Sequence, residues 1–274
     1  MSIWICPVCA APLIQEKSAW LCSNKHSFDQ AKEGYVNLLL ANQKGSKLPG
    51  DSPEMLKARR EFLSGGYYEN VAKKLAEIIE QLKLNRTDSE PCQLVDSGCG
   101  EGYYLDFLQK NLSRPIEFSG LDIAKDGVRL AAKNFPAATW VCGSAARLPI
   151  ASASLDYLLR IFAPGDDAEV QRCLKDDGKL IVLSPAGNHL REIKQFLYDE
   201  VRLHSKPKNI PGFSLCSQDQ VEYVLNLQGS SVIKNLLAMT PFFWQSSYSA
   251  RSELLKLNEL AVTVHVFISQ YEKV

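Results

Sequence analysis

The chain has 274 residues, of which 46% are hydrophobic and 23% are charged, a composition that is typical of folded globular proteins and excludes a disordered chain. Its 31 basic and 31 acidic residues balance, which argues against a general polyanion binder but leaves room for a local basic face. No apolar run approaches the ~18–20 residues that a membrane span needs. The first residues lack the basic region and apolar core of a secretory signal, so we expect a cytoplasmic protein with no membrane partner.

The first 40 residues carry three of the eight cysteines, Cys6, Cys9 and Cys22, followed by His26. A thiolate pair two residues apart fits a tight turn, and a hairpin that returns the second pair completes the tetrahedron of a structural zinc site. Short strands at 13–14 and 19–21 would form this hairpin, so the head is predicted to be a zinc ribbon. Free thiols and a redox pair are the alternatives, but so short a segment has too little core to fold without a metal.

Two helices are predicted after this head. Residues 41–52 are polar, contain glycine and proline, and indicate a linker or an ordered loop. One helix should begin at Asp51 or Ser52, with a proline in its first turn, and end at the glycine pair 65–66. A second helix should span 69–84, where aliphatic residues recur on one side.

From residue 93 the chain alternates between strands and helices. The predicted strands cover 94–96, 116–122, 139–142, 155–161 and 179–184. One predicted helix follows the glycines near residue 100 and ends at 112, and two others cover 125–134 and 169–174. This alternation predicts an α/β fold with a mostly parallel central sheet and helices on both faces. The tail from 218 is less regular, apart from a final strand over 262–268 that is expected to close one edge of the sheet.

A glycine-rich loop follows the first of these strands. The loop contains an acidic residue, Asp96, and three glycines at every second position after it, Gly98, Gly100 and Gly102. The glycines allow a sharp turn and a close approach to a ligand, and Asp122 at the end of the next strand can accept hydrogen bonds from two ribose hydroxyls. Glu101 would repel a pyrophosphate, which argues against a nicotinamide dinucleotide. The loop resembles motif I of Rossmann-like, S-adenosylmethionine-dependent methyltransferases, whose cofactor is cationic. In such enzymes the segment 142–149 flanks the adenine.

The whole chain up to residue 204 resembles the bacterial 23S rRNA (guanine-N1-)-methyltransferases, and the last seventy residues match them loosely. The resemblance rests on these segments: the cysteine and histidine pairs of the head, 31–38, 50–55, 58–60, 98–104, 160–164 and His189. It implies three regions: a zinc-binding ribbon for RNA recognition over 1–40, a connector and helix over 41–68, and an S-adenosylmethionine-dependent methyltransferase domain over 69–274.

The resemblance also implies roles for individual residues. Zn²⁺, one structural ion per chain, would be held by Cys6, Cys9, Cys22 and His26. S-adenosylmethionine would be contacted at positions that match Tyr68, Gly100, Glu101 and His189, with the ribose on Asp122. The family dimerises, and the two ribbons would frame a cleft for a hairpin of 23S rRNA. We therefore expect a homodimer with this RNA hairpin as its partner.

Guanine N1 lies on the Watson–Crick edge, so the target base must leave its pair before it reacts. Phe162, in the segment 160–164 after the fourth strand, is predicted to stack on that base. The general base stays unassigned, because Asp166 and Asp167 lie nearby but match no acidic position of the family. Arg59 and Arg60, with Lys44 and Lys47, form either a phosphate-binding strip or a solvated helix face.

Three functions are therefore open, in this order of preference. The first is methyl transfer from S-adenosylmethionine to N1 of a specific guanine in a hairpin loop of 23S rRNA. The second is a small-molecule methyltransferase whose zinc head is purely structural. The third is a non-catalytic module that binds RNA or the ribosome, against which the intact loop from Asp96 to Gly102 argues.

Overall fold

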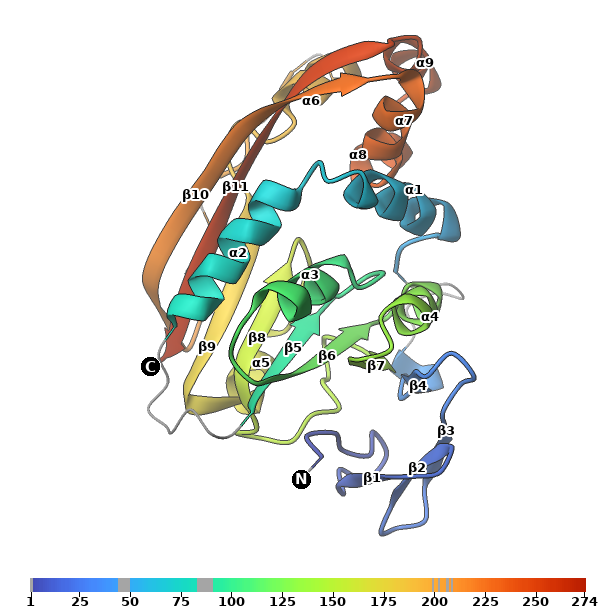
Figure 1. The fold of residues 1–274 in the computed structure, drawn as a ribbon, viewed down its shortest axis with the longest axis vertical. Helices are drawn as coiled ribbons and strands as arrows, with labels where there is room; N and C mark the ends of the chain where they lie inside the picture. Colours follow the sequence, from blue (N-terminus) through green and yellow to red (C-terminus); the bar gives the residue numbers. More distant parts are fainter. Residues whose placement is uncertain are drawn as a thin grey trace.

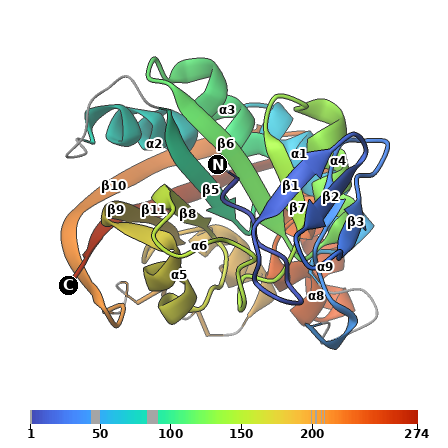
Figure 2. The ribbon, with the colours of Figure 1, turned by 90° about the horizontal axis from the view of Figure 1, so that it is seen from below.

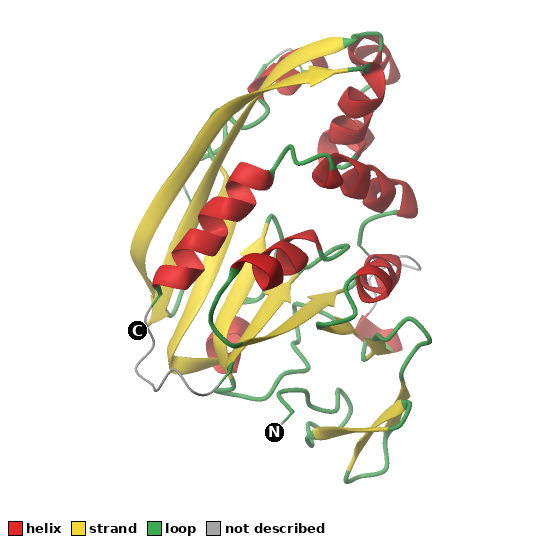
Figure 3. Cartoon of the chain, viewed as in Figure 1, coloured by secondary structure: helices red, strands yellow, loops and turns green. Residues whose placement is uncertain are grey.

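The chain folds into two sheets, a three-stranded one near the N-terminus and an eight-stranded one that forms the body of the molecule (Figure 1). Helices lie on both faces of the larger sheet, as Figure 3 shows by secondary structure. The computed structural model describes residues 2–43, 50–82, 91–198, 200–201, 203–205, 207 and 209–274, except for the side chains of 244–245.

The small sheet contains three antiparallel strands, β1 (Leu13–Glu16), β2 (Ala19–Cys22) and β3 (Ser27–Asp29). The first two are the hairpin that the sequence predicts, and Lys17 makes the turn between them with a φ of 52°. β3 pairs with β2 and has only three residues. A strand so short shows no hydrophobic alternation, which is why it was not predicted.

Three helical segments lie between β4 (Val36–Asn37) and β5 (Cys92–Ser97), two strands of the larger sheet: η1 (Ala41–Gln43), α1 (Pro53–Ser64) and α2 (Glu69–Gln81). The Ser52 hydroxyl accepts a hydrogen bond from the Met55 amide at 3.3 Å and caps the start of α1, as the sequence predicts. Gly65 follows its last residue. The second helix begins at its predicted position and ends three residues before the predicted 84.

Among the described residues, seven strands of the larger sheet run in one direction, and one strand, β11, runs in the opposite direction. The strands of this sheet, in spatial order, are β10 (Phe213–Gln228), β11 (Glu259–Lys273), β9 (Leu174–Pro185), β8 (Leu155–Ile161), β5 (Cys92–Ser97), β6 (Ile116–Asp122), β7 (Thr139–Cys142) and β4 (Val36–Asn37). All strands from β4 to β9 run parallel, and β11 pairs antiparallel with β9 and β10. The predicted α/β fold is thus confirmed.

The remaining helices of the described chain follow the strands in sequence. They are α3 (Tyr103–Asn111), α4 (Lys125–Asn134), α5 (Asp167–Cys173), α6 (Arg191–Leu197), α7 (Ser230–Ala238), α8 (Pro241–Gln245) and α9 (Tyr248–Leu255). The first three correspond to the predicted helices, and α4 has the predicted limits. Within the described part of the chain, none of these helices has both the length and the apolarity to cross a bilayer.

The C-terminal strand does not close the sheet, so this prediction was wrong. β11 pairs on one side with β9 and on the other with β10, which forms the edge. β10 was missed, although Val221, Tyr223, Leu225 and Leu227 alternate with more exposed residues along it. The helices α7, α8 and α9 lie between the two strands in sequence, so no tight turn marks them as neighbours.

The larger sheet has a hydrophobic core on each face. Leu94 belongs to the core under α1 to α4, while Val95 faces the opposite side, where the core includes Val170 of α5. Residues of the N-terminal head complete this second core, Trp4 and Trp20 among them. The head therefore covers part of a sheet face, and Figure 2 shows it in front of the β7 side of the body.

Candidate zinc centre and cofactor site

The four predicted metal ligands lie together in the head. Their ligand atoms all lie within 4.8 Å of one another, with the Cys9 and Cys22 sulfurs 3.7 Å apart. The His26 Nδ1 lies 3.5 Å from the Cys6 sulfur and 3.4 Å from the Cys22 sulfur. A zinc ion with ordinary bond lengths at the centre of a tetrahedron needs S–S and S–N separations of about 3.8 and about 3.5 Å. The residues fit a structural zinc ion, with Nδ1 as the nitrogen ligand.

Two similar backbone turns present these ligands. The Ala10 amide donates to the Cys6 carbonyl at 2.8 Å, and the Lys25 amide donates to the Cys22 carbonyl at 3.0 Å. Both Ala10 and Lys25 have positive φ, of 60° and 65°. In the first turn, the Ala11 amide is the main group that lowers the pKa of Cys9 to about 6. The turn thus stabilises the thiolate that zinc needs, as the spacing of the cysteines predicts.

The glycine loop lies between the ends of β5 and β8. Gly98 has a φ of 91°, and a Cβ atom there would come within 2.4 Å of the Ala163 Cβ. Gly102 also has a φ of 91° and precedes α3, and a Cβ there would meet the Trp140 ring at 2.7 Å. Both positions therefore require glycine, and the loop is held against the segment that follows β8.

Asp122 ties this loop to the end of β6. Its carboxylate accepts hydrogen bonds from the Gly100 amide at 2.8 Å and from the Ala124 amide at 2.7 Å. Burial raises the pKa of Asp122, and these two amide hydrogen bonds oppose the rise. Each carboxylate oxygen keeps further lone pairs, so the group fits a ribose as the predicted acceptor of two hydroxyls.

Asp96 lies at the base of the loop and is 1% exposed. Its Oδ1 atom is buried and has no hydrogen-bond partner among the described residues. Burial, followed by the neighbouring Asp122, raises the pKa of Asp96 to about 8. A buried carboxyl oxygen without a partner is costly, and a cationic group beside it would remove this cost. The site therefore fits a cationic cofactor such as S-adenosylmethionine.

Glu101 and Arg59 add to the charge around the loop. Burial raises the pKa of Glu101, while Arg60 and Arg59 oppose the rise. Arg59 pairs with Asp51 and donates to the Met239 carbonyl at 3.3 Å, and its Nη1 lies 3.3 Å from where a Cβ of Gly100 would stand.

Arg59 thus borders the cofactor loop, where an ion pair and a carbonyl hold its guanidinium. The phosphate-binding strip and the solvated helix face both stay predictions for this residue. Lys44 and Lys47, the other end of that strip, lie outside the described residues. No motif pointed to a place for Arg59 in the site, because its neighbours come from the turn before α1, the glycine loop and the segment after α7.

Tyr68 and His189 meet although 121 positions separate them in the sequence. Tyr68 precedes α2 and His189 follows β9, and both are buried. The Tyr68 hydroxyl lies 3.4 Å from the His189 Nε2, and the His189 Nδ1 accepts a hydrogen bond from the His265 amide at 3.2 Å. Burial lowers the pKa of His189 to about 3, so the ring is neutral at physiological pH.

Phe162 lies directly after β8 with a φ of 51°, a conformation that non-glycine residues rarely adopt. This residue is 42% exposed, although its side chain is large and apolar. The ring stacks on His189 with the centroids 5.8 Å apart and the planes at 22°. Backbone strain and exposed aromatic surface together at a strand end are typical of a binding position.

The two acids near this position have structural contacts. The Asp166 carboxylate accepts from the Glu169 amide at 3.0 Å and caps α5, and Asp167 pairs with Arg160 at 2.8 Å. These contacts give neither acid a role as the general base, which stays unassigned.

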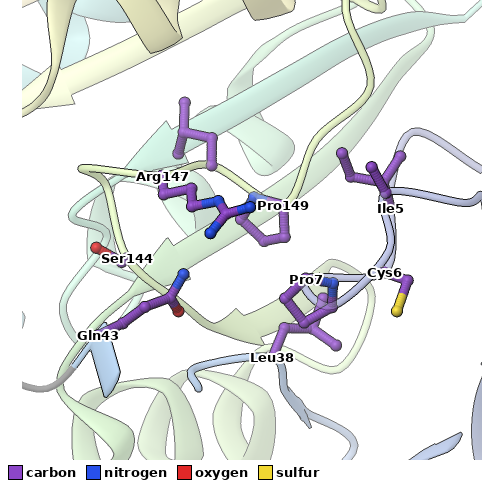
Figure 4. A pocket seen from close by; sticks show the side chains of 10 residues that line it. Ile5, Cys6, Pro7, Leu38, Gln43, Ser144, Arg147 and Pro149 are labelled. Atoms are coloured by element: carbon purple, nitrogen blue, oxygen red, sulfur yellow. The ribbon is translucent and has the colours of Figure 1, made fainter. Parts of the chain in front are cut away.

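A small cavity of about 40 Å³ lies where the head meets the segment after β7 (Figure 4). It is lined by Ile5, Cys6, Pro7, Ala10, Leu38, Gln43, Ser144, Arg147, Leu148 and Pro149. Half of the segment 142–149, predicted to flank the adenine, thus faces the head. Arg147 is exposed, and Figure 4 shows its guanidinium and the Gln43 amide on the same side of the opening.

Two family models match the chain. A zinc-ribbon model described as "RlmA, N-terminal" matches residues 4–47, and a model described as "Methyltransferase domain" matches residues 94–178. The first confirms the ribbon predicted for the head, and the second confirms the domain type predicted from the glycine loop.

Three curated relatives align with most of the chain. A Bacillus subtilis (strain 168) protein, provisionally named 23S rRNA (guanine-N(1)-)-methyltransferase YxjB, is 31% identical over 97% of this chain and 96% of its own length. A provisionally named 23S rRNA (guanine-N(1)-)-methyltransferase of Micromonospora griseorubida is 35% identical over 69% and 67% of the two chains. The 23S rRNA (guanine(748)-N(1))-methyltransferase of Streptomyces fradiae is 31% identical over 87% and 85%.

The likeness spans both parts of the molecule, the ribbon with its zinc ligands and the sheet with its cofactor loop. As its motifs predict, the chain belongs to the family of S-adenosylmethionine-dependent, zinc-ribbon 23S rRNA (guanine-N1-)-methyltransferases.

Proposed function

We propose that this chain transfers a methyl group from S-adenosylmethionine to N1 of a guanine in a hairpin loop of 23S rRNA. The observation that carries the proposal is the acidic glycine loop, in which the buried Oδ1 of Asp96 has no partner among the described residues. Such a loop suits a cation and repels a pyrophosphate. The family relatives supply the nature of the acceptor, since each carries the name of an enzyme that acts on guanine N1 of 23S rRNA.

The cofactor would be held by eight residues around this loop. They are Tyr68, Asp96, Gly98, Gly100, Glu101, Gly102, Asp122 and His189. Asp122 would accept from the ribose hydroxyls, and Asp96 would face the cationic part of the cofactor. When bound, S-adenosylmethionine supplies a methyl group on a positively charged sulfur. The loop and the segment after β8 meet at Gly98 and Ala163, so a base presented at Phe162 would lie beside the cofactor.

We propose that Phe162 stacks on the target guanine. The base must leave its pair to expose N1, and an aromatic platform offsets part of the lost stacking, by about 1–3 kcal/mol per base in other proteins. Phe162 offers the necessary exposed ring at a strand end. Because methyl transfer needs an in-line approach, the main task of these residues is to hold the base in position.

We assign RNA recognition to the ribbon, residues 1–40, and to its junction with the methyltransferase domain over 69–274, joined by the connector 41–68. Gln43 accepts from the Leu40 amide through Oε1, at 3.1 Å, which leaves its amide N–H groups for a ligand. None of the residues that line the junction cavity carries a carboxylate. Arg147 and Gln43 thus present donors to an RNA phosphate. The family resemblance supports a cytoplasmic homodimer in which two ribbons enclose the hairpin.

Primer extension tests the proposed function directly. Purified protein is incubated with labelled S-adenosylmethionine and protein-free 23S rRNA from cells that lack the gene, and a methyl group at guanine N1 then stops the polymerase. We expect one stop, lost in Asp122→Ala and retained in the control Asp126→Ala, whose carboxylate pairs with Arg129 on α4. Cofactor binding without label transfer to RNA would contradict the proposal and favour a small-molecule methyltransferase.

A further inference from the structure

One buried imidazole lies between the cofactor site and the platform for the base. His189 is 6% exposed, and its ring has three ring neighbours among the described residues, Tyr68, Phe162 and His204. Tyr68 lies edge-on to it, with centroids 6.2 Å apart at 64°, and Phe162 stacks on it nearly parallel. Tyr68 and Phe162 are themselves 6.4 Å apart, so these two rings form one cluster with His189.

The backbone fixes which way this imidazole faces. The His265 amide donates to Nδ1, so Nδ1 carries no proton, and a neutral ring must carry its proton on Nε2. That Nε2–H group donates to the Tyr68 hydroxyl oxygen at 3.4 Å. The Tyr68 proton therefore stays available for another acceptor.

The turn that carries His189 is fixed on both sides. The His189 amide donates to the Ala186 carbonyl at 2.9 Å, and the next residue, Leu190, donates to the Thr263 carbonyl at 2.8 Å. Leu190 has a φ of 51°, which is a strained conformation for leucine. A ring held by its backbone and by an amide at Nδ1 can support its neighbours without turning.

Phe162 depends on this support because much of its surface is exposed. Its amide donates to the Leu183 carbonyl at 3.0 Å, which fixes the backbone but leaves the side chain free to rotate. The stacked His189 ring, which is buried, supports Phe162, and the exposed part of Phe162 is open to a ligand.

We infer that His189 is a positioning residue with two separate tasks: its Nε2–H orients Tyr68 toward the cofactor, and its ring face supports Phe162 against the target guanine. This rests on the proposed function and goes beyond a cofactor contact, because it makes one side chain necessary for both substrates through different atoms.

Two substitutions separate the tasks. In His189→Gln the side-chain amide keeps a donor for Tyr68 and loses the ring, while His189→Phe keeps a ring and loses the donor. For each variant, calorimetry gives the Kd of S-adenosylhomocysteine, and methyl transfer gives the KM for the 23S rRNA hairpin. We expect His189→Phe to raise the Kd about tenfold and to leave the KM within about twofold of wild type. His189→Gln should do the reverse.

Two results would overturn the inference. If both variants raise only the Kd, His189 is a cofactor ligand and no more, and if neither variant changes either value, it merely fills space. Wild-type protein without activity on 23S rRNA would end the proposed function and this inference together. An active wild type whose variants fail to separate the two values would end only the inference.

A second route applies where the His189 variants do not fold. In otherwise wild-type protein, Tyr68→Phe should raise only the Kd and Phe162→Ala only the KM, each by about tenfold. The nitrogen shifts of the His189 imidazole should show the Nε2–H form at neutral pH. A ring protonated on Nδ1, or one variant that changes both values equally, would contradict the inference.

Discussion

Asp96 is a carboxyl group whose charge depends on what lies beside it. In the free protein it is buried, its Oδ1 has no partner among the described residues, and Asp122 is its nearest source of negative charge. These conditions favour the protonated form. A cation placed next to the group reverses the preference. Cofactor binding and ionisation of Asp96 should therefore be coupled.

This coupling predicts a pH dependence of cofactor affinity. Because the pKa of Asp96 is about 8 in the free protein, the group must lose a proton to bind a cation at lower pH. The affinity for S-adenosylmethionine should rise between pH 6 and pH 8, by up to about tenfold per unit, and then level off. Calorimetry across this range, in buffers of different ionisation enthalpy, measures the affinity and the proton release. An affinity that stays constant over the range would contradict the coupling.

Replacing the same residue should separate stability from binding. A carboxyl whose pKa is raised in the folded state costs stability once pH rises above its unfolded pKa of about 3.9. Asp96→Asn removes this ionisation, so at pH 8 it should stabilise the free protein by about 1–3 kcal/mol and abolish the pH dependence of cofactor binding. Thermal melts at pH 5 and pH 8 check this, since the gain should shrink at the lower pH.

At this scale the sequence predicts residues whose roles depend on local spacing. Asp96 on β5 and Asp122 at the end of β6 are both predicted from their spacing to the glycines of the loop. In the structure both residues border that loop. The contact of Tyr68 with His189 depends on how β9, β11 and the start of α2 meet, which no local pattern encodes. Only the family resemblance brought these two residues forward, and it gave no reason for their contact.

At the scale of elements, the glycine loop and the segment after β8 approach each other so closely at Gly98 that a Cβ there has no room. A Cβ at Gly98 would stand 2.4 Å from the Ala163 Cβ, and neither backbone can shift without moving β5 or β8. Gly34 has a similar φ, 103°, but nothing lies within 4 Å of its Cβ position. The two glycines thus share a conformation and differ in their surroundings.

This pair predicts two different costs for the same substitution. Gly34→Ala should lower the free energy of unfolding by about 1 kcal/mol, the strain of a positive φ alone. Gly98→Ala adds a clash in the loop and should cost about 2–4 kcal/mol and most of the cofactor affinity. Urea unfolding and calorimetry give both values. Equal costs would mean that Ala163 gives way without loss.

The elements that the sequence predicts are those with a strand, a turn and a helix in short succession. β5 to β8 and the helices between them follow this rule, and their predicted limits agree within two residues. The edge strand β10 lacks this local signal, because its partner strand, β11, begins more than thirty residues after β10 ends. β4 has only two residues and joins the sheet through β7, so no periodicity reveals it.

At the scale of the whole molecule, the ribbon is part of the body. The Ile5 amide donates to the Pro149 carbonyl at 2.9 Å, and the Ala151 amide donates to the Ile3 carbonyl at 2.8 Å. Trp4 lies in the core that this face of the sheet shares with the ribbon. An RNA bound across the junction would therefore meet a rigid surface.

The proposed RNA surface predicts a specific effect of Arg147. Arg147→Ala should raise the KM for 23S rRNA about fivefold and leave the Kd of the cofactor unchanged. The slope of log affinity for RNA against log salt concentration should fall by about one, the value for one lost phosphate contact. The matched control is Lys256→Ala, an exposed cation that pairs with Glu253 and directly follows α9, which lies at the opposite end of the molecule from the ribbon (Figure 1). Equal effects of the two substitutions would mean that Arg147 contributes only general charge.

Removal of zinc should unfold both sheets in one step. Because the ribbon completes the core on one face of the larger sheet, Cys9→Ser or chelation should lower the Tm of the whole protein and abolish cofactor binding in the same transition. Cys216→Ser is the control, since this exposed cysteine on β10 lies outside the zinc cluster. Two separate melting transitions would show that the sheets fold independently.

The shared core also ties the lifetime of the enzyme to metal supply. A detached ribbon would uncover buried side chains such as Trp4, Leu13 and Ile150, which are the kind of surface that chaperones and proteases recognise. We expect zinc-starved cells to degrade the protein completely instead of accumulating a methyltransferase that has lost only its hold on RNA. Modification of the ribosome would then follow the zinc content of the cell through protein abundance.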